Sequence, residues 1–72
     1  LTPHEGWIGH SIADFEGAAG ARVGVITRFG TGELPLPSML IQSGDTLHVL
    51  VTEDRLKELG AIAGSAPDGG SA

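Results

Sequence analysis

Residues 21–30, ARVGVITRFG, carry the clearest periodic pattern in the chain and decide its fold class. Side chains at the odd positions alternate with those at the even positions, which is typical of a half-buried β-strand. We expect one face of this strand to consist of Ala21, Val23, Val25, Thr27 and Phe29. Residues 46–52 repeat the pattern and predict a second strand. The buried face of that strand would consist of Leu47, Val49 and Val51.

The first twenty residues predict shorter elements. Leu1–Glu5 is a candidate strand, and Trp7, which lies near two flexible glycines, is a candidate core anchor. Ser11 is suited to cap a helix over residues 12–18, because a serine hydroxyl can accept a bond from a free amide of the first turn. Gly20 would end this helix, because glycine readily adopts the left-handed conformation.

The second half of the chain predicts a hairpin and a second helix. A turn at residues 30–33 leads into Leu34–Pro37, which its prolines hold extended at a sheet edge. Residues 39–42 are expected to pair with the strand at 46–52 through a tight turn at 43–45. A helix is expected after Thr52. Its apolar stripe would consist of Leu56, Leu59, Ile62 and Ala63.

These elements indicate an α+β fold, in which two short helices accompany a small, mainly antiparallel sheet. The domain is expected to span residues 1–63. Residues 64–72 consist only of Gly, Ala, Ser, Pro and Asp and predict a disordered tail.

Composition narrows the classes of partner. The chain has 72 residues and no cysteine, so a single small core must form without disulfides or a thiolate zinc site, and a homodimer would support it. Its net charge of −5, with nine acidic residues against four basic ones, argues against nucleic-acid binding. No apolar run approaches the roughly 20 residues of a membrane-spanning helix, so direct membrane insertion is not expected. The lack of cysteine fits a cytoplasmic location.

Three groups of residues invite a catalytic or cofactor interpretation. Gly30-Thr31-Gly32 is better explained as a hairpin turn than as a dinucleotide loop, because no helix begins after it. His4, His10 and Asp14 provide metal-binding side chains at spacings that do not match a zinc-protease helix. A small metal-dependent hydrolase built on them is the alternative from a different class. The possible catalytic triad of Ser11, Asp45 and His48 is explained by capping, turn formation and an outward strand position. We expect no enzyme and no metal site.

Two arginines of the long strand leave alternatives open. Arg28, at the end of the strand, could meet a phosphate or a partner's carboxylate, or could simply keep the sheet margin hydrated. Arg22 could be a cation in a groove or an ordinary solvent-facing strand residue.

Several motifs also occur in a characteristic order. Trp7-Ile8-Gly9 precedes a helix, the strand ends in Thr27-Arg28-Phe29-Gly30, Pro35 follows, and Gly44-Asp45 precedes the next apolar strand. In order and spacing, from about residue 6 to 62, these motifs resemble the C-terminal domain of the TrkA family, also called RCK_C. The sequence looks closest to actinobacterial potassium-uptake proteins.

The resemblance implies a cytoplasmic regulatory domain that pairs about a two-fold axis. In such subunits it follows a Rossmann domain that holds NAD or ATP, and it acts on a membrane potassium-translocating partner. Some relatives bind cyclic di-AMP in the groove between two paired domains. The residues expected to bind a ligand here are Ile12, Glu16, Arg22, Val23, Arg28 and Pro37. A similar domain in a cation/proton antiporter is the alternative of the same class.

Overall fold

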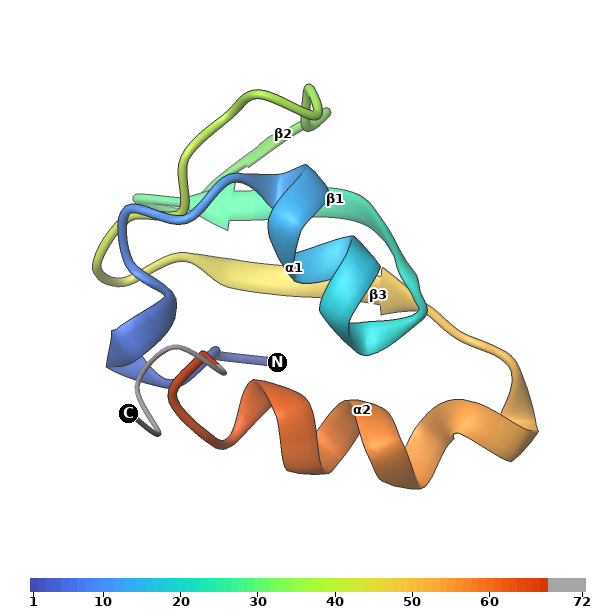
Figure 1. Cartoon of the computed structure of the whole chain (residues 1–72). Coiled ribbons are helices and arrows are strands. Elements are labelled where there is room, and N and C mark those ends of the chain that lie inside the picture. The colour runs from blue at the N-terminus through green and yellow to red at the C-terminus, as the bar shows by residue number, and fades with distance from the viewer. Residues whose placement is uncertain (68–72) are drawn as a thin grey trace.

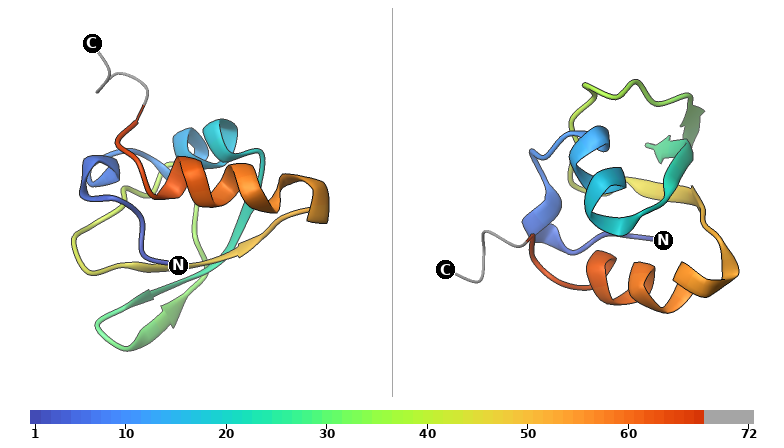
Figure 2. Two further views of the ribbon diagram at one scale, coloured as in Figure 1. Left: turned by 90° about the horizontal axis from the view of Figure 1, so that it is seen from below. Right: turned by 45° about the vertical axis from the view of Figure 1, so that its right-hand side comes forward.

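A computed structural model describes residues 1–67 of the chain (Figure 1). Two helices lie on one side of a three-stranded sheet, which confirms the predicted α+β fold (Figure 2). In chain order, the elements are the 3-10 helix η1 (Glu5–Trp7), α1 (Ile12–Ala19), β1 (Arg22–Arg28), β2 (Thr31–Glu33), β3 (Thr46–Leu50), the 3-10 helix η2 (Glu53–Arg55) and α2 (Leu56–Ala63). Within the described residues, no helix combines the length and the hydropathy needed to cross a bilayer.

The long strand β1 lies in the middle of the sheet, with β2 and β3 antiparallel on either side. The expected hairpin between residues 39–42 and β3 is therefore wrong, since β3 pairs with β1 instead. Residues 39–41 are held by the chain before α1. Ile41 donates to the His10 carbonyl at 2.9 Å, and its own carbonyl accepts from Gly9 at 2.8 Å. Only an isolated bridge, Ser11 to Leu40, remains of the predicted strand.

An irregularity in β1 changes which side chains are buried. Val23 pairs with Val49 while Val25 pairs with His48, so Gly24 is an extra residue on β1. An extra residue exchanges the two faces of a strand beyond it. Val23 and Ile26 are accordingly buried, whereas Phe29 is 93% exposed. The predicted face of odd positions is correct at Val23 and wrong beyond the bulge.

The core lies between the sheet and the helices. Trp7 is buried, as predicted, and its ring packs edge-on against Phe15 with ring centres 5.1 Å apart. The indole nitrogen donates to the carbonyls of Ser65, at 2.9 Å, and Ile62, at 3.2 Å. The buried apolar residues are Trp7, Ile12, Phe15, Ala19, Val23, Ile26, Ile41, Leu47, Leu59 and Ala63.

Both helix predictions are largely confirmed. Ser11 caps α1 by accepting from the Asp14 amide at 3.0 Å, and Gly20 ends the helix at φ 65° in the left-handed region. In α2, Leu59 and Ala63 are buried as expected. Leu56 is wrong as a core residue, because its side chain remains 58% exposed at the start of the helix.

Three local expectations differ from the structure. Leu1–Glu5 is not a strand, although Leu1 and Leu47 exchange two backbone hydrogen bonds. The hairpin turn falls at Phe29 and Gly30, both at positive φ, so Thr31–Glu33 forms β2 rather than the turn. Leu34–Pro37 does not join the sheet.

The predicted tail is described only in part. Within it, the Ser65 carbonyl accepts a hydrogen bond from the indole nitrogen of Trp7. Residues 68–72 lie outside the described residues.

Candidate ligand groove

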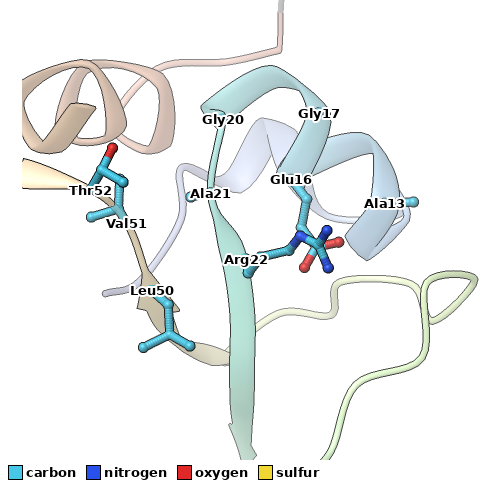
Figure 3. Close-up of a pocket in the computed structure, with 9 residues that line it drawn as sticks. All are labelled: Ala13, Glu16, Gly17, Gly20, Ala21, Arg22, Leu50, Val51 and Thr52. Carbon is cyan, nitrogen blue, oxygen red and sulfur yellow. The ribbon is translucent and has the colours of Figure 1, made fainter. Parts of the chain in front are cut away.

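A groove of about 750 Å³ lies where α1 passes into β1 and where β3 ends (Figure 3). Its walls are formed by α1, the corner after it and the segment that leaves β3. Small side chains predominate, and the charged members are Glu16 and Arg22. The lining residues are Ala13, Glu16, Gly17, Gly20, Ala21, Arg22, Leu50, Val51 and Thr52.

A carboxylate closes the corner between α1 and β1. The left-handed backbone of Gly20 turns the chain from the helix toward the strand. One oxygen of Glu16 then accepts from the Val23 amide at 2.8 Å and so joins the last turns of α1 to the start of β1. Glu16 is half-buried, whereas Arg22 beside this amide is exposed. Among the residues that line the groove, Arg22 is the single cation.

The predicted ligand residues divide into two sets. Glu16 and Arg22 line the groove, and Val23 contributes its amide to the corner while its side chain is buried. Ile12 lies in the core. Pro37 lies at the other end of α1, where its carbonyl accepts from Ala13 at 3.0 Å. Their binding roles remain predictions.

Arg28, the sixth predicted ligand residue, is held at the far end of β1. Its Nε and Nη2 donate to the two carboxylate oxygens of Asp45, each at 2.8 Å, and Nη2 also reaches the Leu40 carbonyl at 3.1 Å. Asp45 is 1% exposed and also accepts from the Gln42 amide at 2.9 Å. The carboxylate that meets Arg28 therefore belongs to its own chain.

This pairing shifts the pKa values of both groups. The hydrogen bonds from Arg28 lower the pKa of Asp45 against the opposing effect of its burial. The same bonds raise the pKa of Arg28. Sequence reasoning treated Asp45 as a turn former and missed this role. The Gly44-Asp45 motif marks the position of the carboxylate, but no local pattern indicates which cation will pair with it.

The histidines make local contacts. His10 pairs with Asp14 one helical turn away, and His4 accepts from the Gly6 amide at 2.9 Å. His48 bonds the Thr27 hydroxyl across the strands at 2.9 Å, while Asp45 pairs with Arg28 instead. Within residues 1–67, no three metal-binding side chains gather closely enough to hold an ion. The structure therefore brings together neither the candidate metal set nor the candidate triad.

The comparisons with known proteins agree with this architecture. The model of the TrkA-C domain family matches residues 1–64. The chain belongs to the TrkA-C domain family, as the order of its motifs suggested. A curated relative, the Trk system potassium uptake protein TrkA of the actinobacterium Streptomyces coelicolor, is 32% identical over 62 residues. The match covers 86% of this chain and 28% of that protein. No solved structure gives a significant match.

Proposed function

We propose that this chain is the regulatory and pairing domain of a potassium-uptake regulatory subunit, and that it senses a nucleotide in the groove. Family membership and the relative from Streptomyces support the potassium-uptake role. The open groove between α1 and β1 supports the sensing role, because it combines a backbone corner, a carboxylate and a cation.

Pairing is supported by what the single chain leaves open. The α1 side of the groove presents Ala13 and Gly17 to solvent, and nothing lies within 4 Å of where a Gly17 side chain would begin. Small residues allow two helix surfaces to approach closely. A second copy related by a two-fold axis would face this groove with its own and enclose a ligand between them. The pairing would also support a core that is small for a self-sufficient domain.

A groove formed by two paired copies suits a ligand that carries two phosphates better than a ligand that carries one. Two copies of Arg22 would provide one guanidinium for each phosphate, and arginine binds phosphate oxygens through paired donors. The free oxygen of Glu16 can accept from a base or a ribose hydroxyl. Cyclic di-AMP has this chemistry and is the nucleotide we propose to test first.

Sedimentation of the chain tests the pairing, and titration calorimetry with cyclic di-AMP tests the sensing. Arg22→Gln is expected to weaken nucleotide binding by about ten-fold or more while the dimer persists. The matched control is Lys57→Gln, because Lys57 is exposed on α2 and does not line the groove. A monomer at all concentrations would contradict the pairing. A dimer that binds no nucleotide would refute the sensing role and would mean that the domain serves only to pair subunits.

The remaining proposal concerns the whole subunit. We infer that a Rossmann domain that binds NAD or ATP accompanies this domain, and that the pair acts on a membrane potassium-translocating subunit from the cytoplasmic side. Co-purification of the full-length subunit with that membrane partner tests this proposal. Association with a cation/proton antiporter instead would redirect it to the alternative transporter class.

A further inference from the structure

A second arginine lies beside the corner where α1 passes into β1. The guanidinium of Arg55, from η2, covers Gly20 so closely that a side chain beginning there would lie 2.8 Å from Nη1 and 3.0 Å from Cζ. Gly20 lines the groove, and so does Thr52, whose carbonyl accepts from the Arg55 amide at 2.9 Å. Figure 3 shows Gly20 and Thr52 on the α2 side of the groove, opposite Ala13. Arg55 therefore borders the groove at this end, although it is not one of the lining residues.

The guanidinium of Arg55 is loosely held. Its one hydrogen bond within the described residues runs from Nη1 to Glu58 Oε2, at 3.1 Å. Both side chains are largely exposed, at 49% and 65%, so water screens the attraction between them. A guanidinium also has more N–H donors than this bond uses. Arg55 can therefore exchange Glu58 for a stronger acceptor at little cost.

The charges of the groove give Arg55 a role that Arg22 does not fill alone. The lining residues include one cation, Arg22, and one carboxylate, Glu16, so their charges cancel. The net charge of the chain is −5, which disfavours an approaching anion. Arg28 is bound to a carboxylate at the far end of β1. Arg55, beside Gly20, is placed to give this end of the groove a net positive charge.

We propose that Arg55 is a ligand-binding residue of the groove, and that an anionic ligand draws its guanidinium away from Glu58. The inference rests on the sensing role proposed above and assigns to Arg55 a phosphate group of the ligand. Phosphate oxygens accept from an arginine at two points, through charge-assisted hydrogen bonds, whereas Glu58 accepts one bond. In the free domain, Glu58 competes with the ligand for Arg55.

The exchange needs no change in α2. Arg55 occupies the position that precedes this helix, and Glu58 lies in its first turn. A carboxylate in the first turn is stabilised by the positive end of the helix, so Glu58 keeps a favourable place after Arg55 has left it. Binding therefore moves one flexible side chain and leaves the backbone as it is.

Titration calorimetry with cyclic di-AMP compares the two members of the pair. Arg55→Gln is expected to weaken binding by about five-fold or more, because it removes the cation. Glu58→Gln is expected to tighten binding by about two- to five-fold, because it removes the competitor. A gain in affinity does not arise from a poorly folded variant. If the unaltered chain binds and neither variant changes the affinity, the proposal is overturned and the sensing role stands.

Two further variants separate this exchange from a general effect of charge. Glu5→Gln removes the same charge from η1, does not touch the groove lining and is expected to leave the affinity unchanged. In the double variant Arg55→Gln/Glu58→Gln, the gain from Glu58→Gln is expected to disappear. Tighter binding in Glu5→Gln, or a gain that persists without Arg55, would overturn the proposal.

A second readout does not depend on the nucleotide. Titration with pyrophosphate is expected to shift the NMR signal of the Arg55 Nε–H group, and to do so at lower concentration in Glu58→Gln. A shift with pyrophosphate but no binding of cyclic di-AMP would support the role of Arg55 and refute the nucleotide. No shift with either compound would overturn the proposal. A lower melting temperature in Arg55→Gln with unchanged affinity would also overturn it, because Arg55 would then only stabilise the negative end of α1.

Discussion

Arg28 and Asp45, 17 residues apart in the chain, form a bidentate ion pair, in which the guanidinium donates two hydrogen bonds of 2.8 Å to the carboxylate. The pair connects the end of β1 to the turn before β3, and the Leu40 carbonyl and the Gln42 amide complete its hydrogen bonds. A buried carboxylate without such partners would be strongly unfavourable. The pair therefore fixes the end of the sheet at which β1 and the 40–45 loop meet.

Breaking this pair is expected to destabilise the domain strongly. Asp45→Asn leaves a half-buried guanidinium without its carboxylate and should reduce the free energy of unfolding by about 3–5 kcal/mol. Urea unfolding measures the change. The control Glu58→Gln removes an exposed partner of Arg55 and should cost less than about 0.5 kcal/mol. Similar small costs for both variants would show that Asp45 acts only as a turn residue.

The same pair predicts a pH dependence of stability. The folded pKa of Asp45 lies below its ordinary value of 3.8, so the unfolded chain takes up its proton first as the pH falls. The stability that Asp45 provides is complete above about pH 4 and is lost as the pH falls through its lower folded pKa. Urea midpoints measured from pH 7 to pH 2 should decline below pH 4 less steeply in Asp45→Asn. Parallel curves for the two proteins would contradict this assignment.

The corner at Gly20 is expected to accept no other residue readily. Gly20→Ala places a methyl group in a left-handed backbone, at 2.8 Å from Arg55 Nη1, and should cost about 1–2 kcal/mol. Gly60→Ala is the matched control, since Gly60 lies within α2 with open space around it and should be neutral or stabilising by up to about 1 kcal/mol. Thermal unfolding of both variants checks the difference, and an equal response would remove the backbone argument.

The hairpin tip predicts a stabilising change. Phe29 has a φ of 53° and an almost fully exposed ring, whereas two-residue turns with positive φ favour Asn or Gly. Phe29→Asn should therefore raise the free energy of unfolding by about 0.5–1 kcal/mol. Thr31→Asn, in the adjacent exposed strand, should give no gain. A loss of stability in Phe29→Asn would indicate contacts of the ring that the single chain does not explain.

The indole nitrogen of Trp7 provides a final test of the core. Trp7→Phe keeps an aromatic ring but removes the indole donor shared by the carbonyls of Ser65 and Ile62, of which Ile62 keeps a bond from the Ser65 amide, and should cost about 1–3 kcal/mol. The expected readout is a lower urea midpoint together with faster proteolysis after Ala63. An unchanged midpoint would show that the segment after α2 is held by other contacts.

The sequence by itself determined the elements whose signals are local. Ser11 and Gly20 bound the first helix through cap chemistry, and the order of the motifs indicated the family. The alternation in residues 46–52 identified β3, which ends two residues earlier, at Leu50. Such features depend on a few neighbouring residues, so they can be read without knowing the fold. Glu16 and Arg22, proposed from the resemblance, line one groove, and their binding role stays a prediction.

Only the tertiary structure decided which segments pair and which charges meet. Residues 39–41 carry a plausible strand pattern, but their backbone bonds are taken by residues 9–12, which no local signal reveals. The bulge at Gly24 exchanges the two faces of β1. Its position is set by the register with β3, so the alternation within residues 21–30 does not reveal it. The pairing of Asp45 with Arg28 also depends on the tertiary structure. A buried carboxylate must be paired, and the chain topology determines which cation lies close enough to pair with it.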